Sequence, residues 1–156
     1  MRLRILLPLV LLPAALLSLA ACSHDTTGPT DPLVANYEAD PRCLWDCWFT
    51  VRSVSNPADT LNLTNQFSAR FELDLQSNGS YQMQLSAPGV VDPYQDNGSF
   101  TSTGSLLILS GTDGVDTVDY QLNSPLLRLS FRKHFALTGL FSGTDTVSVQ
   151  AMLKKF

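Results

Sequence analysis

The amino-acid sequence predicts an all-β domain: a single antiparallel up-and-down β-barrel of about eight strands, with a short helical turn near its N-terminal end. Apolar and polar residues alternate with a period of two along several stretches, as they do in strands with one buried face. Turn-forming pairs such as Asn78-Gly79 separate these stretches, and no long amphipathic helical pattern competes with them. Closure is favoured because a closed barrel leaves no edge strand exposed to aggregation.

The clearest strand pattern lies between Phe67 and Ser86. A first run has apolar residues at every second position and ends before Asn78-Gly79, a pair that readily adopts the positive φ angles of a tight hairpin turn. The alternation then continues on a return strand. The apolar positions of this predicted hairpin are Phe67, Ala69, Phe71, Leu73 and Leu75, followed by Tyr81, Met83 and Leu85.

The same alternation recurs on both sides of this hairpin. A strand from Trp48 to Val54 is expected before it, and several more are expected after it. Strands in such number, joined mainly by short turns, are typical of an antiparallel sandwich or barrel. The later strands carry Phe100 after Asn97-Gly98, the run 106–109 after Gly104, then Val118, Tyr120 and Leu122, then Leu127, Leu129 and Phe131, and finally Val147, Val149, Ala151 and Leu153.

The N-terminal segment has the layout of a secretory signal. Arg2 and Arg4 form a short basic start, and an uncharged apolar run from Ile5 to Ala21 follows. Two prolines break this run, which is also short for a membrane-spanning helix. The run ends Leu19-Ala20-Ala21-Cys22, which resembles the lipobox of bacterial lipoproteins.

That resemblance implies a signal peptide at residues 1–21, cleavage before Cys22, and lipid, including palmitate, on that cysteine. Membrane attachment through this lipid is then the one partner interaction that the N-terminus specifies. Ser23 resembles the sorting residue of Gram-negative outer-membrane lipoproteins, so we expect a location in the bacterial cell envelope, at the outer membrane. The alternative is an ordinary secretory peptide cut at a nearby small residue, with Cys22 incidental.

The rest of the chain divides into a tether and one domain. Residues 22–33 are polar and rich in turn formers, so we expect a flexible tether there, while residues 34–156 suit a single domain. Without residues 1–21 the chain keeps eight basic against fourteen acidic residues, a formal charge of −6. Such a charge excludes nucleic acid as the expected partner. We interpret the basic runs 132–134 and 154–155 as solvated strand ends.

Cys43 and Cys47 are the most informative side chains of the predicted domain. Four residues along a strand would separate them by about 13 Å, whereas a helical turn brings their Cα atoms to about 6 Å, within disulfide reach. Asp40 and Pro41 suit a helix start, so we expect a short helix from about Pro41 to Cys47. A structural disulfide is the favoured interpretation in an oxidising compartment, with a redox or metal sensor and a zinc site as alternatives.

The tether and strand pattern together resemble the small bacterial lipoproteins with a lipocalin-like barrel. The resemblance is carried by the Asn78-Gly79-Ser80-Tyr81 hairpin and by the hairpin from 96–100 to 104–106. Asp46-Cys47-Trp48 stands where true lipocalins have Gly-x-Trp. The resemblance implies that the helical turn closes one end of the barrel, with Leu44, Trp45 or Trp48 covering the core.

A barrel of this size either fills with its own side chains or holds one small ligand. We therefore expect a non-enzymatic domain that binds a small apolar molecule, with a filled barrel that binds a protein partner or has a structural role as the alternative. The protein partners are unknown. The expected ligand-binding positions are the large inward residues Phe67, Phe71, Tyr81, Met83, Phe100, Tyr120, Leu129 and Phe131.

Catalytic and cofactor motifs are not visible in the sequence. His134 is the single histidine of the predicted domain, and no Gly-x-Ser-x-Gly elbow is present. Asp113, Asp116 and Asp119 do not match the twelve-residue calcium loop, and we interpret them as a solvated strand start. We therefore expect no catalytic residue, no metal and no cofactor.

Overall fold

Alternating side chains fold this chain into long antiparallel strands, each with one apolar face. The computed structural model describes residues 31–43, 46–54, 58, 60–89, 91–134 and 146–156. Eight strands form a closed antiparallel barrel, as the sequence predicts. They are β1 (Ala35–Ala39), β4 (Arg70–Leu75), β5 (Ser80–Ala87), β6 (Val91–Thr103), β7 (Leu106–Gly111), β8 (Gly114–Asn123), β9 (Leu126–His134) and β10 (Thr146–Lys155).

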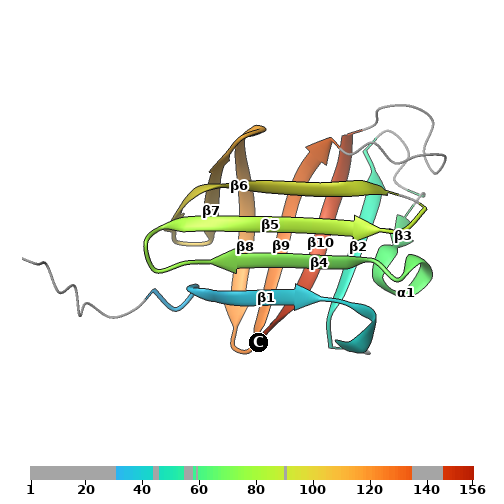
Figure 1. Cartoon of the computed structure of the whole chain (residues 1–156), viewed down its shortest axis with the longest axis horizontal. Helices are drawn as coiled ribbons and strands as arrows, with labels where there is room; N and C mark the ends of the chain where they lie inside the picture. The colour runs from blue at the N-terminus through green and yellow to red at the C-terminus, as the bar shows by residue number, and fades with distance from the viewer. Residues whose placement is uncertain (1–30, 44–45, 55–57, 59, 90, 135–145) are drawn as a thin grey trace, which may run out of the picture.

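From β4 to β10 each strand pairs with the next one in the chain, and β1 pairs with both β4 and β10 to close the ring. In Figure 1, β1, β4, β5 and β6 form a layer that crosses β8, β9, β10 and β2 behind it. The barrel is therefore flattened into two layers whose strands run across one another. Within the described residues, none of the helices has the length and apolar character that a membrane crossing needs.

The expected strand from Trp48 to Val54 is present as β2 (Trp48–Ser53), but it lies beside the ring of eight. The remaining strand of the ring is β1, a segment in which the sequence pattern predicts no strand. One edge of β10 serves both: Val147 to Met152 pair with β2, and Lys154 and Lys155 pair with β1. Both strands fit along this one edge because β1 and β2 pair with different stretches of β10.

The predicted start of a strand at Phe67 is wrong, since Phe67 ends a short helix, α1 (Leu63–Phe67), and β4 begins at Arg70. The Asn62 side chain caps this helix by accepting a hydrogen bond from the Asn65 N–H at 3.0 Å. At the other end Ser68 adopts a left-handed conformation, with φ of 53°. The polar side chains of this segment therefore favour a helical turn over an extended strand.

Helix α1 packs against β2, β3 (Thr60–Asn62) and β5, and it buries Leu63 and Thr64. It lies close to β3 at one side of the barrel (Figure 1). The inward side chains of the strands form one continuous apolar core, which includes a tilted contact between the Phe49 and Phe71 rings, with centroids 5.3 Å apart. Apolar packing inside the barrel is thus the main source of its stability.

Candidate functional site

The predicted interior row lies mostly in the buried core. Six of its members are at most 8% exposed and make up the centre of the barrel, and Tyr120 is half-buried against them. Phe67 packs on the core from α1 rather than from a strand. A side chain that lined an internal chamber would keep surface open to a small molecule. The six with at most 8% exposure are Phe71, Tyr81, Met83, Phe100, Leu129 and Phe131.

A set of polar side chains also gathers near the turn between β7 and β8; those on the strands point into the barrel, and Thr112 of the turn is exposed. We call Tyr81, Tyr94, Asp96, Thr112, Asp116 and Lys133 the inner polar cluster. These residues come from β5, β6, β8, β9 and the β7–β8 turn, far apart in the sequence. Ionisable groups brought together in an interior are the most chemically distinctive feature of this fold.

Asp96 is the centre of one half of the cluster and is 3% exposed. Its Oδ2 accepts a hydrogen bond from the Tyr81 hydroxyl at 2.6 Å. Its Oδ1 accepts from the Thr112 N–H and hydroxyl at 2.9 and 2.8 Å, and from the Asn97 N–H at 2.9 Å. Burial by itself raises the pKa of the Asp96 carboxyl, but these hydrogen bonds together hold the pKa below its usual value.

Two facing glycines make room for this half of the cluster. Gly98 in β6 pairs with Gly111 in β7, and Tyr81 lies opposite Gly98 on the other side. A Cβ atom at Gly111 would overlap the Tyr81 hydroxyl and the Asp96 carboxylate. The absence of a side chain at Gly111 therefore permits the Tyr81–Asp96 hydrogen bond. Burial, with the contact to Asp96, raises the pKa of the Tyr81 hydroxyl far above its usual value.

Lys133 is the centre of the other half. Its ammonium lies 2.5 Å from Asp116 Oδ2 and 5.3 Å from the centre of the Tyr94 ring. The Lys133 side chain is 9% exposed and that of Asp116 is 19% exposed. Burial lowers the pKa of Lys133, but hydrogen bonds to Asp116 and Tyr94 raise it more, so the net pKa is raised. Burial in turn raises the pKa of Tyr94 to about 12, so the phenol is neutral and the lysine charged at neutral pH.

The interpretation of residues 132–134 as solvated strand ends is therefore wrong for Lys133, and that of Asp116 as part of a solvated strand start is also wrong. The physical reason is that a buried salt bridge with hydrogen bonds can offset the loss of hydration. Asp113 and Asp119 are exposed, as expected. Among the described residues, no three His, Cys, Asp or Glu side chains gather closely enough to hold a metal ion.

The cysteine pair lies in the connection between β1 and β2. Cys43 and Cys47 are joined in a disulfide with Cα atoms 5.4 Å apart, in agreement with the predicted turn geometry. The helical turn is a 3-10 helix, η1 (Pro41–Cys43), and is shorter than expected. Leu44 and Trp45 lie outside the described residues, and Phe49 rather than Trp48 is fully buried at the start of β2.

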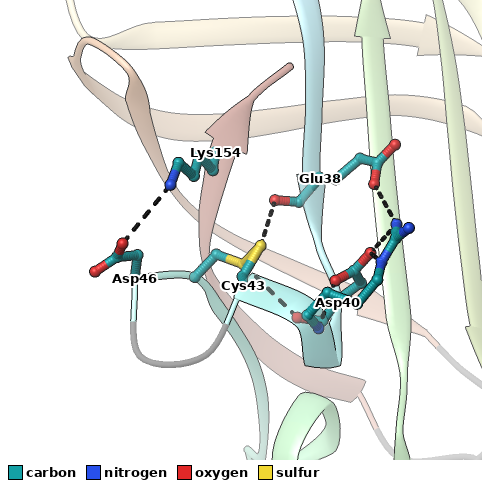
Figure 2. Close-up of a disulfide and its surroundings, with 7 residues drawn as sticks. Glu38, Asp40, Cys43, Asp46 and Lys154 are labelled. Carbon is teal, nitrogen blue, oxygen red and sulfur yellow. Dashed lines mark hydrogen bonds and ion pairs between the residues drawn. A yellow bond between two sulfur atoms is a disulfide. The ribbon is translucent and has the colours of Figure 1, made fainter.

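Charged side chains surround this disulfide (Figure 2). Asp40 caps the turn by accepting the Arg42 N–H at 2.7 Å, and hydrogen bonding to the Arg42 guanidinium holds the pKa of Asp40 below its usual value. The Cys43 sulfur lies 3.9 Å from the Glu38 carbonyl oxygen, and Lys154 lies 3.7 Å from Asp46. Because Cys47 is fully buried, the geometry favours a structural role over thiol exchange.

In comparisons with protein-family models, with curated proteins and with solved structures, no match to this chain was found.

The Asp96 hydrogen bonds predict a pH-dependent contribution to stability. We expect Asp96→Asn to lower the free energy of unfolding by about 2 kcal/mol at neutral pH, because hydrogen bonds to an ionised acceptor are lost. A carboxyl with a depressed pKa in the folded state stabilises the fold above about pH 4 and loses this effect as the pH falls through the folded pKa. The difference between wild type and variant, measured by urea unfolding, should therefore shrink below about pH 4. A constant difference would contradict the assignment, and Asp119→Asn is the exposed control.

The buried pair predicts strong coupling between Lys133 and Asp116. We expect Lys133→Met to cost about 3 kcal/mol, since it leaves the Asp116 carboxylate without its partner. The double variant Lys133→Met with Asp116→Leu should recover most of this loss, because no uncompensated charge remains. Thermal and urea unfolding of the four proteins of this cycle gives the coupling. Additive losses would show that the two side chains do not interact in solution.

Proposed function

We propose that this protein is a lipid-anchored bacterial envelope protein, with a lipocalin-like barrel that is filled by its own side chains and contacts its partner through the outer surface. The observation that carries the proposal is the packing of the interior. The buried side chains contributed by all eight strands form one apolar core, and the polar ones hydrogen-bond to one another. A barrel of this kind is a rigid support for an external surface.

This proposal differs from binding of a small apolar molecule in the barrel interior. Such a ligand would have to displace Phe71, Phe100 or Phe131, each of which lies in the continuous core. Displacing a large core side chain costs several kcal/mol, which a small ligand would have to supply from its own contacts. The packing therefore favours a filled barrel.

The anchor in this proposal is lipid on Cys22. Asp31 is attached to the barrel by hydrogen bonds. Its carboxylate accepts from the Leu33 N–H at 2.9 Å and from the Ser102 hydroxyl at 3.2 Å. Leu33 is 1% exposed, so the last residues of the predicted tether are part of the domain. The chain from Cys22 to Asp31 spans at most about 30 Å when fully extended. The domain would thus stand close to the membrane that holds it.

The anchor is tested by Cys22→Ala in cells that express the full-length chain. We expect the wild type to incorporate a clickable palmitate analogue and to sediment with envelope membranes, and the variant to lose the label. Cys43→Ser with Cys47→Ser is the matched control and should keep the label. Equal labelling of the Cys22 variant, or loss of label only in the control, would refute anchoring at Cys22.

The filled interior is tested by ligand binding to the detergent-purified protein. Native mass spectrometry after incubation with an envelope lipid extract should recover wild type without ligand. Phe71→Ala should open a dry apolar cavity that binds benzene, seen as a rise in Tm with benzene that the wild type does not show. Leu129→Ala is the second variant if Phe71→Ala fails to fold. Stoichiometric lipid on the wild type would overturn the proposal in favour of an apolar-ligand carrier.

A further inference from the structure

The pairing between β8 and β9 ends before the strands do. Their ladder runs from the turn between them to the pair Asp119 with Ser130. Beyond that pair, residues 114–118 of β8 still pair with β7 and residues 131–134 of β9 still pair with β10, but within the described residues these two stretches do not pair with each other. We call the two stretches the β8–β9 fork. The fork widens away from the shared turn, as the diverging ribbons of β8 and β9 show (Figure 1).

The backbone of β8 has free groups on its fork side. The Tyr120 N–H donates to the Ser105 carbonyl oxygen at 2.8 Å, so the backbone groups of Tyr120 point toward β7. Since these groups alternate in direction along a strand, those of Val115 and Thr117 point toward β9. In the described part of the chain, no hydrogen bond reaches the backbone groups of these two residues.

The backbone of β9 has the same kind of edge. The Lys155 N–H donates to the Pro125 carbonyl oxygen at 2.8 Å, in the register of the β9–β10 ladder, so the odd-numbered residues of β9 turn their backbone groups toward β10. The backbone groups of Arg132 and His134 therefore point toward the fork. In a continued ladder Thr117 would exchange hydrogen bonds with Arg132, but the described ladder stops short of this pair. The barrel wall thus has two facing strand edges at this end.

The space between the two edges is open to solvent. One depression of about 500 Å³ lies between Thr117 and Arg132, and a second of about 370 Å³ extends to His134. Asp116 and Arg132 line both depressions, so the two adjoin. The salt bridge between Lys133 and Asp116 joins the strands on the inner side, where both side chains point into the barrel. The fork is therefore a wedge with an ion pair as its floor and backbone edges as its walls.

The side chains around the fork set little preference for charge. Asp113 and Asp119 place negative charge at its border, and Arg132 places positive charge there. Val115 is 69% exposed, more than any other large apolar side chain among the described residues. A ligand in the fork is thus recognised by backbone groups and an apolar contact rather than by its net charge.

We propose that the β8–β9 fork binds an extended segment of a partner protein, which adds as a strand along the edge of β8. An extended polypeptide repeats its donors and acceptors at the spacing of a β-ladder, and these match the free groups of Val115 and Thr117. A β-branched residue of the segment would pack beside Val115 on the outer face. This inference rests on the proposed function and gives the class of partner and its position on the outer surface.

A second copy of this chain is a poor occupant of the fork, because β8 is acidic. Antiparallel pairing of Val115 with Thr117 of the other copy would place the two Asp116 carboxylates directly opposite each other. The same register would place Asp113 opposite Asp119. Like charges directly opposite one another destabilise a strand pair. The segment that adds to β8 is therefore expected to come from a different protein.

The free edge is tested by amide hydrogen exchange, followed by NMR on the full mature chain in detergent. We expect the Val115 and Thr117 amides to exchange at least about tenfold faster than those of Asp116 and Val118, which face β7 and are bonded to it. Equal protection of the four amides would show that the fork is closed in solution, and would overturn the proposal.

Binding is tested with a displayed library of peptides of about ten residues, selected on the same protein. Thr117→Pro removes the N–H that faces the fork, and proline is tolerated at a strand edge. Thr117→Ala is the matched control, since it removes the side chain and keeps the N–H. A selected peptide should bind Thr117→Pro about tenfold more weakly than wild type and Thr117→Ala within about twofold. The same peptide should slow exchange of the Val115 and Thr117 amides.

The other outcomes decide against the proposal. If no peptide is enriched, or if the selected peptide binds Thr117→Pro as well as wild type, the fork is not the docking site. Protection of Val115 and Thr117 that rises with protein concentration alone would replace the partner by a second copy. If Thr117→Pro fails to fold, unchanged exchange of these two amides with peptide overturns the proposal. Palmitate labelling at Cys22 and lipid recovery on the wild type decide the proposed function separately.

Discussion

The shared edge of β10 is the constraint on which the rest of the architecture depends. One end of this strand pairs with β2 and the other end with β1, and the ring closes only through the pairs Tyr37 with Lys155 and Glu38 with Lys154. The chain must therefore turn sharply between β1 and β2, and Asp40, η1 and the disulfide make that turn. Closure removes a free strand edge, and it also fixes the crossing of the two layers that encloses the core.

The distribution of charge follows from this enclosed core. Carboxylates and cations that point inward or lie at the turn before β2 are matched to one another, as in Lys133 with Asp116 and Arg42 with Asp40. The outer face of β8, β9, β10 and β2 differs, since its Arg52, Arg128 and Arg132 have no such match within the described residues. The same short chain thus separates charges that hold the fold together from charges that remain available at its surface.

The sequence predicts most of the barrel because a period of two is visible wherever a strand has one apolar face, as in β4, β5 and β10. It does not reveal β1, where Ala35, Tyr37 and Ala39 alternate with Asn36 and Glu38 over only five residues, or α1, whose N-terminal cap depends on the side chains of Asn62 and Gln66. The cysteine spacing predicts the disulfide because the geometry of a turn is local. Burial, in contrast, depends on strands that are distant in the sequence.

Strand alternation was the sequence signal that could have revealed the inner polar cluster. Asp96 lies four residues before Phe100, Asp116 two before Val118, and Lys133 two after Phe131, so alternation alone turns each toward the core. A charged side chain in a strand is nevertheless expected to face the solvent, because an isolated charge is costly to bury. Only the pairing of β8 with β9 brings Lys133 and Asp116 together, and the sequence does not specify that partnership.

The short link between Cys22 and Asp31 sets a geometric limit on the protein. If lipid holds Cys22 in a bilayer, Asp31 stays inside a half-sphere of about 30 Å radius around the attachment point. Encounter then becomes a search in two dimensions, at a high local concentration of anything attached to or lying on the same membrane. Under that proposal, molecules on the same membrane are met repeatedly, and the length of the barrel adds to the reach that the link allows.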